Sequence, residues 1–582
     1  MTKSGQKPPP KIHWDKIKIL IVDDQRSASV LLKSLLTQMG IKHIDIADTY
    51  DEAVRACHKT HYNVIMADFH LNHVLNGCEL ICLLRSKKLI SSECGIMMIS
   101  GDHSAEVILA TLSIEPDCFL TKPITNAALT QKITQTLTHC AIRQPVYQAL
   151  EVNKPERALA LCKQQLTEYG HSQKLSDLLL DLLVEQQAWQ QLAPILKFLK
   201  AKHPSHKVTI VEAKHLAHQG QLSQAIQLVE GLVERSPLCL EGFDLLTHYQ
   251  QLNHQMFDAL TTAKRAFMLT PGASHRALTV AQLAADLGNS EELLNAGRTL
   301  ATHLPIIDVN WIIRFAEFNA IFEQLYFSQH NRQARREMLQ QLKGIQHRAF
   351  SRLLPAQQPF LTAYGHIVRA RIYLAEDKPF KAKRRALIGI SHYFEKIAKL
   401  PSVLLVELLP ILIQLGELQL IAEVHHTLSI RDRFDGHSQQ RMALLSTNTV
   451  AIKAIQTLAK QLAEAKSYIS VAPQHAVSLY DAILVRYPYS SEANLGYLDA
   501  LSRLPTESKT YTRLRRLAIS AMPLPADLAL WRNQVLLQLD LHAPDFTEPP
   551  KTAVPLLNLG SLVTNVDPTA DIIELAPPLQ EG

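Results

Sequence analysis

Residues with complementary chemistry follow short apolar runs in the first quarter of the chain. They are two adjacent acids, a third acid, a hydroxyl and an ammonium: Asp23, Asp24, Asp68, Ser100 and Lys122. Carboxylates brought together repel one another unless a hard cation neutralises them, and Mg²⁺ accepts a few carboxylates together with water. A hydroxyl and an ammonium group beside them would hold phosphoryl oxygens. If these side chains meet, they form a site for a metal ion and a phosphoryl group.

The surrounding pattern predicts that they do meet. Short apolar runs are typical of strands buried on both faces of a parallel sheet, and we predict strands at residues 17–22, 42–47, 62–67, 96–99 and 117–120. Helical spacing predicts one helix through Val30, Leu31, Leu35 and Met39, and others at residues 50–59, 79–85, 105–112 and 127–137. Because parallel strands need crossover connections, this alternation indicates a doubly wound α/β sheet. Ligands bind at the carboxyl edge of such sheets, where the five polar residues lie.

These residues resemble the receiver domains of two-component signalling over about residues 17–138. The shared pattern is an acid pair after the first strand, an acid 44 residues later, a Ser after the fourth strand, and Lys-Pro after the fifth. An aromatic residue three positions before the lysine completes it. The resemblance implies a flavodoxin-like fold, with Asp68 as the residue that accepts a phosphoryl group from a histidine kinase or a phosphotransfer protein.

The resemblance also implies the roles of the other residues. Asp23, Asp24 and Asp68 would bind Mg²⁺ with the backbone carbonyl of His70. Ser100 and Lys122 would hold the acyl phosphate. The only reaction implied is the chain's own phosphorylation and dephosphorylation, so no other enzymatic activity is expected.

Ser100 and Phe119 would form a switch, in which the ring turns inward when the hydroxyl moves toward the phosphate. A single aromatic residue in a strand is as often plain core packing, so that alternative stays open for Phe119. Two features depart from the family: Asn72 replaces the usual proline in the loop after Asp68, and the distance from Asp68 to Gly77 is one residue longer than usual.

Beyond Gln144 and Pro145, helical patterns replace the strands. Pro237, Pro271 and Pro305 are 34 residues apart, and small or apolar residues precede each in the same register. They are Ala225, Val229 and Leu232, then Ala259, Ala263 and Ala266, then Leu293, Gly297 and Leu300. The period resembles tetratricopeptide repeats, about five of them, although the family's Trp, Leu-Gly and Tyr positions are poorly kept. Stacked repeats form a solenoid with a surface for a peptide or a partner helix.

The pattern divides the chain into a basic, flexible N-terminus (1–16), a receiver domain (17–140), tetratricopeptide-like repeats (150–310), a further helical repeat region (311–540) and a disordered, acidic, Pro-rich tail (541–582). One more repeat carries Ala476, Tyr480 and Ile483 before Pro488. The most apolar late stretch, Val403–Ile421, contains Glu407, Pro410 and Glu417, which favours a buried helix pair over a membrane span.

Composition restricts the function. A net charge of +6 over 582 residues is mild and the cations are scattered, so nucleic acid is an unlikely partner. The eight cysteines show no zinc-ligand spacing, which fits a reducing cytoplasm. We expect a phosphorylation-gated adaptor that binds an unnamed protein target and can form a homodimer, without membrane contact. The alternatives are a regulator of nucleic acid or transcription machinery, and a phosphate sink without a downstream partner.

Overall fold

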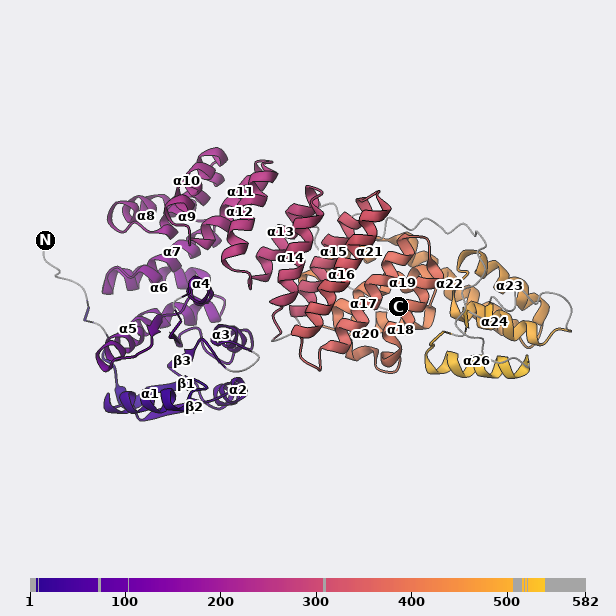
Figure 1. The fold of residues 1–582 in the computed structure, drawn as a ribbon, viewed down its shortest axis with the longest axis horizontal. Coiled ribbons are helices and arrows are strands. Elements are labelled where there is room, and N and C mark those ends of the chain that lie inside the picture. The colour runs from indigo at the N-terminus through magenta and orange to yellow at the C-terminus, as the bar shows by residue number, and fades with distance from the viewer. Residues whose placement is uncertain are drawn as a thin grey trace. The chain divides into compact units, whose positions relative to one another are not determined.

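The computed structural model describes residues 7–8, 10–71, 75–102, 104–306, 310–505, 516–517, 519–520 and 522–539. The predicted tail at 541–582 and the loop residue Asn72 lie outside these ranges. Contacts divide the chain into two compact units, residues 1–287 and 288–582. Figure 1 follows the chain from β1 in indigo to α26 in yellow.

The first unit begins with a five-stranded parallel sheet in the order β2-β1-β3-β4-β5. Its strands are β1 (Lys18–Val22), β2 (His43–Ala47), β3 (Val64–Asp68), β4 (Gly95–Ser100) and β5 (Cys118–Thr121). Every residue of β3 and β4 is buried, as the continuous apolar runs predict. This strand order is the flavodoxin-like one, with its switch point between β1 and β3. The predicted doubly wound α/β fold, followed by an all-α region, is confirmed.

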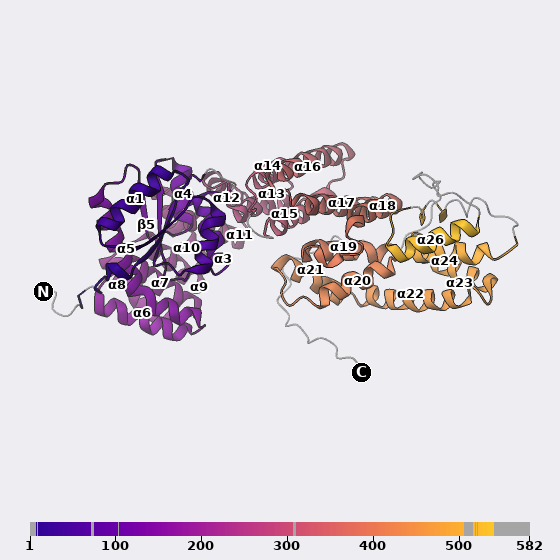
Figure 2. The ribbon, with the colours of Figure 1, turned by 90° about the horizontal axis from the view of Figure 1, so that it is seen from below.

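Helices cover both faces of the sheet. They are α1 (Arg26–Gln38), α2 (Tyr50–Lys59), α3 (Gly77–Ser86), α4 (Ala105–Ser113) and α5 (Asn126–Glu151). Figure 2 shows α1 and α5 on one side of the sheet and α3 on the other. Leu32 and Leu36 of α1 share a core with Ile133 of α5. Val30 and Leu31, predicted to mark the apolar face of this helix, are instead more than half exposed.

The last receiver helix is longer than predicted. It does not end near Leu137 but continues through Pro145 to Glu151. Proline removes one backbone hydrogen bond from a helix interior. Val146 and Ala149, beyond that proline, are buried in one cluster with Leu159 and Leu180 of the next helices, and this packing offsets the loss. A single helix therefore belongs to the sheet at one end and to the helical region at the other.

The rest of the first unit consists of helices joined by short turns: α6 (Pro155–Tyr169), α7 (Gln173–Glu185), α8 (Trp189–Lys202), α9 (His206–His218), α10 (Leu222–Arg235), α11 (Leu240–Leu252), α12 (Met256–Leu269) and α13 (Ser274–Asp286). Helices α9, α11 and α13 begin 34 residues apart. A residue with left-handed φ recurs in the turns every 33 or 34 residues: Asn153, Gln187, Gly220, His254 and Gly288. The small residues predicted for helix crossings, such as Ala225, Ala259 and Ala263, are buried.

The second unit is also helical in its described part. Its helices are α14 (Ser290–Thr302), α15 (Asn310–Ser328), α16 (Arg332–Arg352), α17 (Gln358–Ala375), α18 (Pro379–Ile390), α19 (Ser402–Leu415), α20 (Leu418–Ser429), α21 (Gly436–Thr447), α22 (Thr449–Tyr468), α23 (Pro473–Arg486), α24 (Ser491–Ser502) and α26 (Ala526–Gln538). The apolar stretch near Val403 forms the helix pair α19 and α20, as predicted. Among the helices described, none has the length and apolar character to cross a membrane.

Candidate functional site

The three predicted acids converge at the carboxyl edge of the sheet. Asp23 and Asp24 follow β1, Asp68 ends β3, and carboxylate oxygens of all three lie within 4.8 Å of one another. Asp23 and Asp68 are almost fully buried, whereas Asp24 is half-buried. The backbone N–H of Gln25 donates to Asp23 Oδ1 over 2.9 Å, which orients that carboxylate. Because β1 and β3 are neighbours, the strand order alone brings these acids together.

Lys122 comes from the far strand and reaches into the acid cluster. Its Nζ lies 3.0 Å from Asp23 Oδ2 and 2.9 Å from Asp68 Oδ1. It follows β5 directly, and its backbone N–H donates to the Ser100 carbonyl over 2.9 Å. Burial lowers the pKa of Lys122, but hydrogen bonds to Asp68 and Asp23 outweigh it and leave that pKa above its ordinary value. The lysine is therefore a fixed positive charge in the site.

The environment of Asp68 combines burial with three charged neighbours. Burial raises its pKa above the ordinary value; the contact with Lys122 opposes the shift, and the charges of Asp23 and Asp24 add to it. One lysine does not neutralise three carboxylates, so the cluster retains negative charge at neutral pH. A hard divalent cation with oxygen ligands fits this donor set.

Ser100 and Phe119 lie on the two strands beyond Asp68. Ser100 is the last residue of β4, is fully buried, and its hydroxyl accepts from the backbone N–H of Asp102 over 3.0 Å. Phe119 on β5 is half-buried and pairs in register with Met98. The ring is therefore neither a fully buried core side chain nor a free one.

His70 is exposed, and its ring contacts Asp102. Its ring Nε2 lies 3.3 Å from Asp102 Oδ2 at the rim of the site. The predicted role of the His70 backbone carbonyl concerns another atom and remains a prediction.

Gly77, the first residue of α3, packs against the backbone of Asp68. A Cβ at this position would lie 2.0 Å from the Asp68 carbonyl oxygen and 3.1 Å from Met98 Cε. Real side chains do not approach so closely, so the backbone would have to move. The backbone N–H of Gly77 also donates to the Phe69 carbonyl over 3.0 Å. Gly77 therefore lies against the backbone of Asp68 and Phe69, where a larger residue would not fit.

We expect Gly77→Ala to displace Asp68, to destabilise the protein by about 1–3 kcal/mol, and to lower phosphoryl incorporation from acetyl phosphate severalfold. Thermal unfolding and intact mass would measure the two effects. Gly344→Ala is the matched control, because a Cβ there meets nothing within 4 Å. Wild-type phosphorylation in Gly77→Ala would contradict the proposed role of this close contact.

An ion-pair cluster that sequence reasoning missed joins the sheet to the helical region. Asp117, just before β5, contacts Arg143 of α5 and lies 2.9 Å from Lys174 Nζ of α7. The same lysine donates to the Pro116 carbonyl over 2.7 Å. Burial works to raise the pKa of Asp117, but Arg143 and Lys174 outweigh it and hold that pKa below its ordinary value. No local sequence motif predicts this cluster, since the partners of Asp117 lie 26 and 57 residues further along the chain.

Comparison with known proteins agrees with this geometry. A family model described as the response regulator receiver domain matches residues 19–134. The chemotaxis protein CheY of Pseudomonas aeruginosa is 23% identical over 117 residues, which cover 20% of this chain and 93% of that protein. A probable chemotaxis protein CheY of Rhizobium etli is 35% identical over 57 residues, 10% of this chain and only 44% of that relative. The N-terminal part of the chain therefore contains a CheY-like receiver domain.

Solved structures match the same region. A CheY-like receiver domain protein from Methanospirillum hungatei is 27% identical, with a TM-score of 0.20, over 22% of this chain and 96% of that one. The response regulator TrrA of Thermotoga maritima, solved in complex with Mg²⁺-BeF, is 23% identical, with a TM-score of 0.19, over 21% of this chain and 98% of that one.

Proposed function

We propose that this chain is a response regulator of a two-component phosphorelay, which accepts a phosphoryl group on Asp68 and passes the signal on by protein contact through its helical region. The observation that carries the proposal is the buried cluster of Asp23, Asp24 and Asp68 with Lys122. The donor is a histidine kinase or a phosphotransfer protein. No reaction is proposed beyond phosphoryl capture and its later hydrolysis.

Different residues of the chain have different roles in the proposed phosphoryl transfer. An oxygen of Asp68 forms a bond to phosphorus as the bond to the donor's nitrogen breaks. Lys122, already beside Asp68, would then bind a phosphoryl oxygen, and the buried Ser100 hydroxyl would bind another. Asp23, Asp24 and Asp68 would hold Mg²⁺ with the His70 carbonyl, and the ion, when bound, neutralises carboxylate and phosphoryl oxygens. The half-buried Phe119 would follow the movement of Ser100.

We propose that the signal leaves the receiver through α5 and the Asp117 cluster. Helix α5 is shared between the sheet and the first helical pair. Ser92, in the loop before β4, donates to Glu151 Oε1 at the end of the same helix, with its hydroxyl at 2.5 Å. A shift of β5 on phosphorylation would therefore act directly on α5, α6 and α7. We retain the proposed division into a receiver at 17–140, tetratricopeptide-like repeats at 150–310 and further repeats at 311–540, in which α5 connects the first two parts.

The test is hydrogen exchange on the full chain, with and without beryllium fluoride and Mg²⁺, which mimic the phosphorylated state. We expect exchange in α6 and α7 to change in the wild type and to stay constant in Asp68→Ala. Lys174→Met, which removes one partner of Asp117, should reduce the response in α7 by at least about half, since interactions in one network are coupled.

Lys200→Met is the matched control, because Lys200 forms an exposed ion pair with Glu212 that does not involve the receiver. The contrary outcome is hydrogen exchange in α6 and α7 that is the same with and without beryllium fluoride, although acetyl phosphate still phosphorylates Asp68. That result would favour a phosphate sink over an adaptor.

A further inference from the structure

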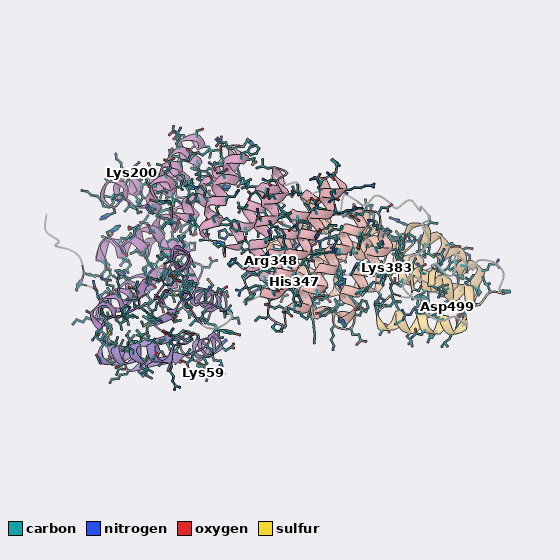
Figure 3. All side chains as sticks on the ribbon, viewed as in Figure 1. Lys59, Lys200, His347, Arg348, Lys383 and Asp499 are labelled. Atoms are coloured by element: carbon teal, nitrogen blue, oxygen red, sulfur yellow. The ribbon has the colours of Figure 1, made fainter. Side chains whose placement is uncertain are left out.

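A cavity of about 450 Å³ lies between α16, α17 and α18 in the second unit. It is lined by basic and aromatic side chains, among them Lys343, His347, His366, Arg369, Tyr373 and Arg385. None of the described residues that line it is acidic. Figure 3 labels His347, at the cavity, and Arg348, the next residue on α16.

The cations of this cavity have no counter-ions in the described part of the chain. Lys343, Arg369 and Arg385 make no ion pair with any residue that the structure places. The neighbouring arginine on α17 behaves differently, because Arg371 is buried and contacts both Glu323 and Glu407. Like charges that converge on one concave site create a potential that attracts anions.

Two polar nitrogens of the cavity also lack partners. Gln346 Nε2 and His366 Nδ1 are buried and have no hydrogen-bond partner among the described residues. Burial and the charge of Arg385 lower the pKa of His366, which agrees with a positive potential at this wall. Buried polar groups are normally hydrogen-bonded, so the cavity has both charge and two unpartnered polar nitrogens in its lining.

We infer that this cavity binds the carboxylates of an acidic protein segment. The inference deepens the proposed function, on which it rests, by naming the kind of partner that the helical region takes. The cavity lies in the usual size range of ligand sites. Phe350, Leu361 and Tyr373 give it an apolar surface on which the methylene groups of glutamate can pack.

Nucleic acid fits this cavity less well. Binding to a phosphate backbone needs cations that follow the strand, whereas Lys343, Arg369 and Arg385 converge on one hollow. Inorganic phosphate would use the charges but not the apolar surface. Both ligands are therefore alternatives that an experiment can separate from an acidic peptide.

The test is fluorescence anisotropy of a labelled, glutamate-rich peptide on the full chain. We expect Arg369→Glu/Arg385→Glu to weaken binding by about tenfold or more, because the double charge reversal replaces attraction of the peptide carboxylates with repulsion. Arg348→Glu changes the charge of the same helix equally and is the control, because Arg348 is exposed and does not line the cavity. Arg385→Gln, at an exposed position, tests the same contact with little risk to folding.

Equal weakening by Arg348→Glu, or equal binding of the matching glutamine peptide, would overturn the inference. So would a single-stranded oligonucleotide or inorganic phosphate that binds more tightly at the same residues. Every measurement is repeated in Asp68→Ala. Arginine-dependent peptide binding there would support the cavity even if the proposed phosphorylation failed, which separates the two failures.

Discussion

Acetyl phosphate with Mg²⁺ should place a phosphoryl group on the wild-type protein and none on an Asp68→Asn variant. An amide is not a nucleophile toward phosphorus, and Asp68, the proposed acceptor, lies beside Lys122 and within the acid cluster. We expect incorporation to fall at least about a hundredfold, in line with the loss of an essential group. Intact mass would measure the added phosphoryl group, and reductive trapping would locate it.

Asp48→Asn is the control for that experiment. Asp48 follows β2 at the same edge of the sheet, but β2 is the outer strand, and Asp48 is not in the acid cluster. Its variant should be phosphorylated like the wild type. A chelator should abolish incorporation and added Mg²⁺ should restore it. Phosphorylation of the Asn variant at another residue would refute Asp68 as the acceptor.

The acid cluster could be predicted from sequence because its information is local. Each of its acids ends a buried strand or follows one within two residues, and parallel strands all end at the same edge. The acids after β1 and at the end of β3 then lie close together, since these two strands are neighbours in the observed sheet. The position of Asp68 in space therefore follows from short apolar runs and their alternation with helices.

Two details were predicted wrongly: the buried face of α1 and the end of α5. Both depend on packing against neighbouring elements, which apolar periodicity does not determine. In α1 the apolar residues Val30 and Leu31 face outward, and the buried face is formed by Ser29, Leu32 and Leu36. Apolar spacing marks a helix but does not fix which stripe meets the core when several apolar positions compete.

The end of α5 was the second failure. The helix was predicted to end near Leu137, but Val146 and Ala149 beyond Pro145 are buried against α6 and α7, so the helix continues to Glu151. Proline disfavours a helix interior by about 3 kcal/mol, which is comparable to what one or two buried apolar side chains return. A sequence pattern shows the cost of a proline in a helix, but it does not show how much free energy the burial of the following residues returns.

Long-range charge pairs were beyond sequence reasoning for a different reason. Lys383 of α18 is fully buried, and its Nζ lies 2.8 Å from both Glu417 Oε1 and Ser491 Oγ. Glu417 stands just before α20 and Ser491 begins α24, and neither has a motif that identifies it. Lys383 also donates to the Tyr489 carbonyl, so it joins α18 to the turn before α24. A buried lysine in a sequence looks like any surface lysine.

Lys383→Met should be among the most destabilising substitutions in the second unit. It leaves Glu417 buried without its cation, and the usual cost of breaking such a pair is about 3–5 kcal/mol. Urea unfolding followed by circular dichroism would measure it. Lys200→Met removes an exposed pair and should cost less than about 1 kcal/mol. Lys383→Met/Glu417→Gln should recover part of the loss, because no unpaired charge remains at Glu417.

The destabilisation caused by Lys383→Met should depend on pH, because a nearby buried carboxyl binds protons. Burial, then the charge of Glu417, raises the pKa of Glu492 to about 7. A carboxyl whose pKa is raised on folding binds more protons in the native state, so its contribution to stability grows as pH falls from about 7 toward its unfolded value. Lys383 lowers the pKa of Glu492, so its removal should raise that pKa further. The deficit of Lys383→Met should therefore be smaller at mildly acidic than at neutral pH. A deficit that is independent of pH would mean that lost packing, rather than uncompensated charge, destabilises the variant.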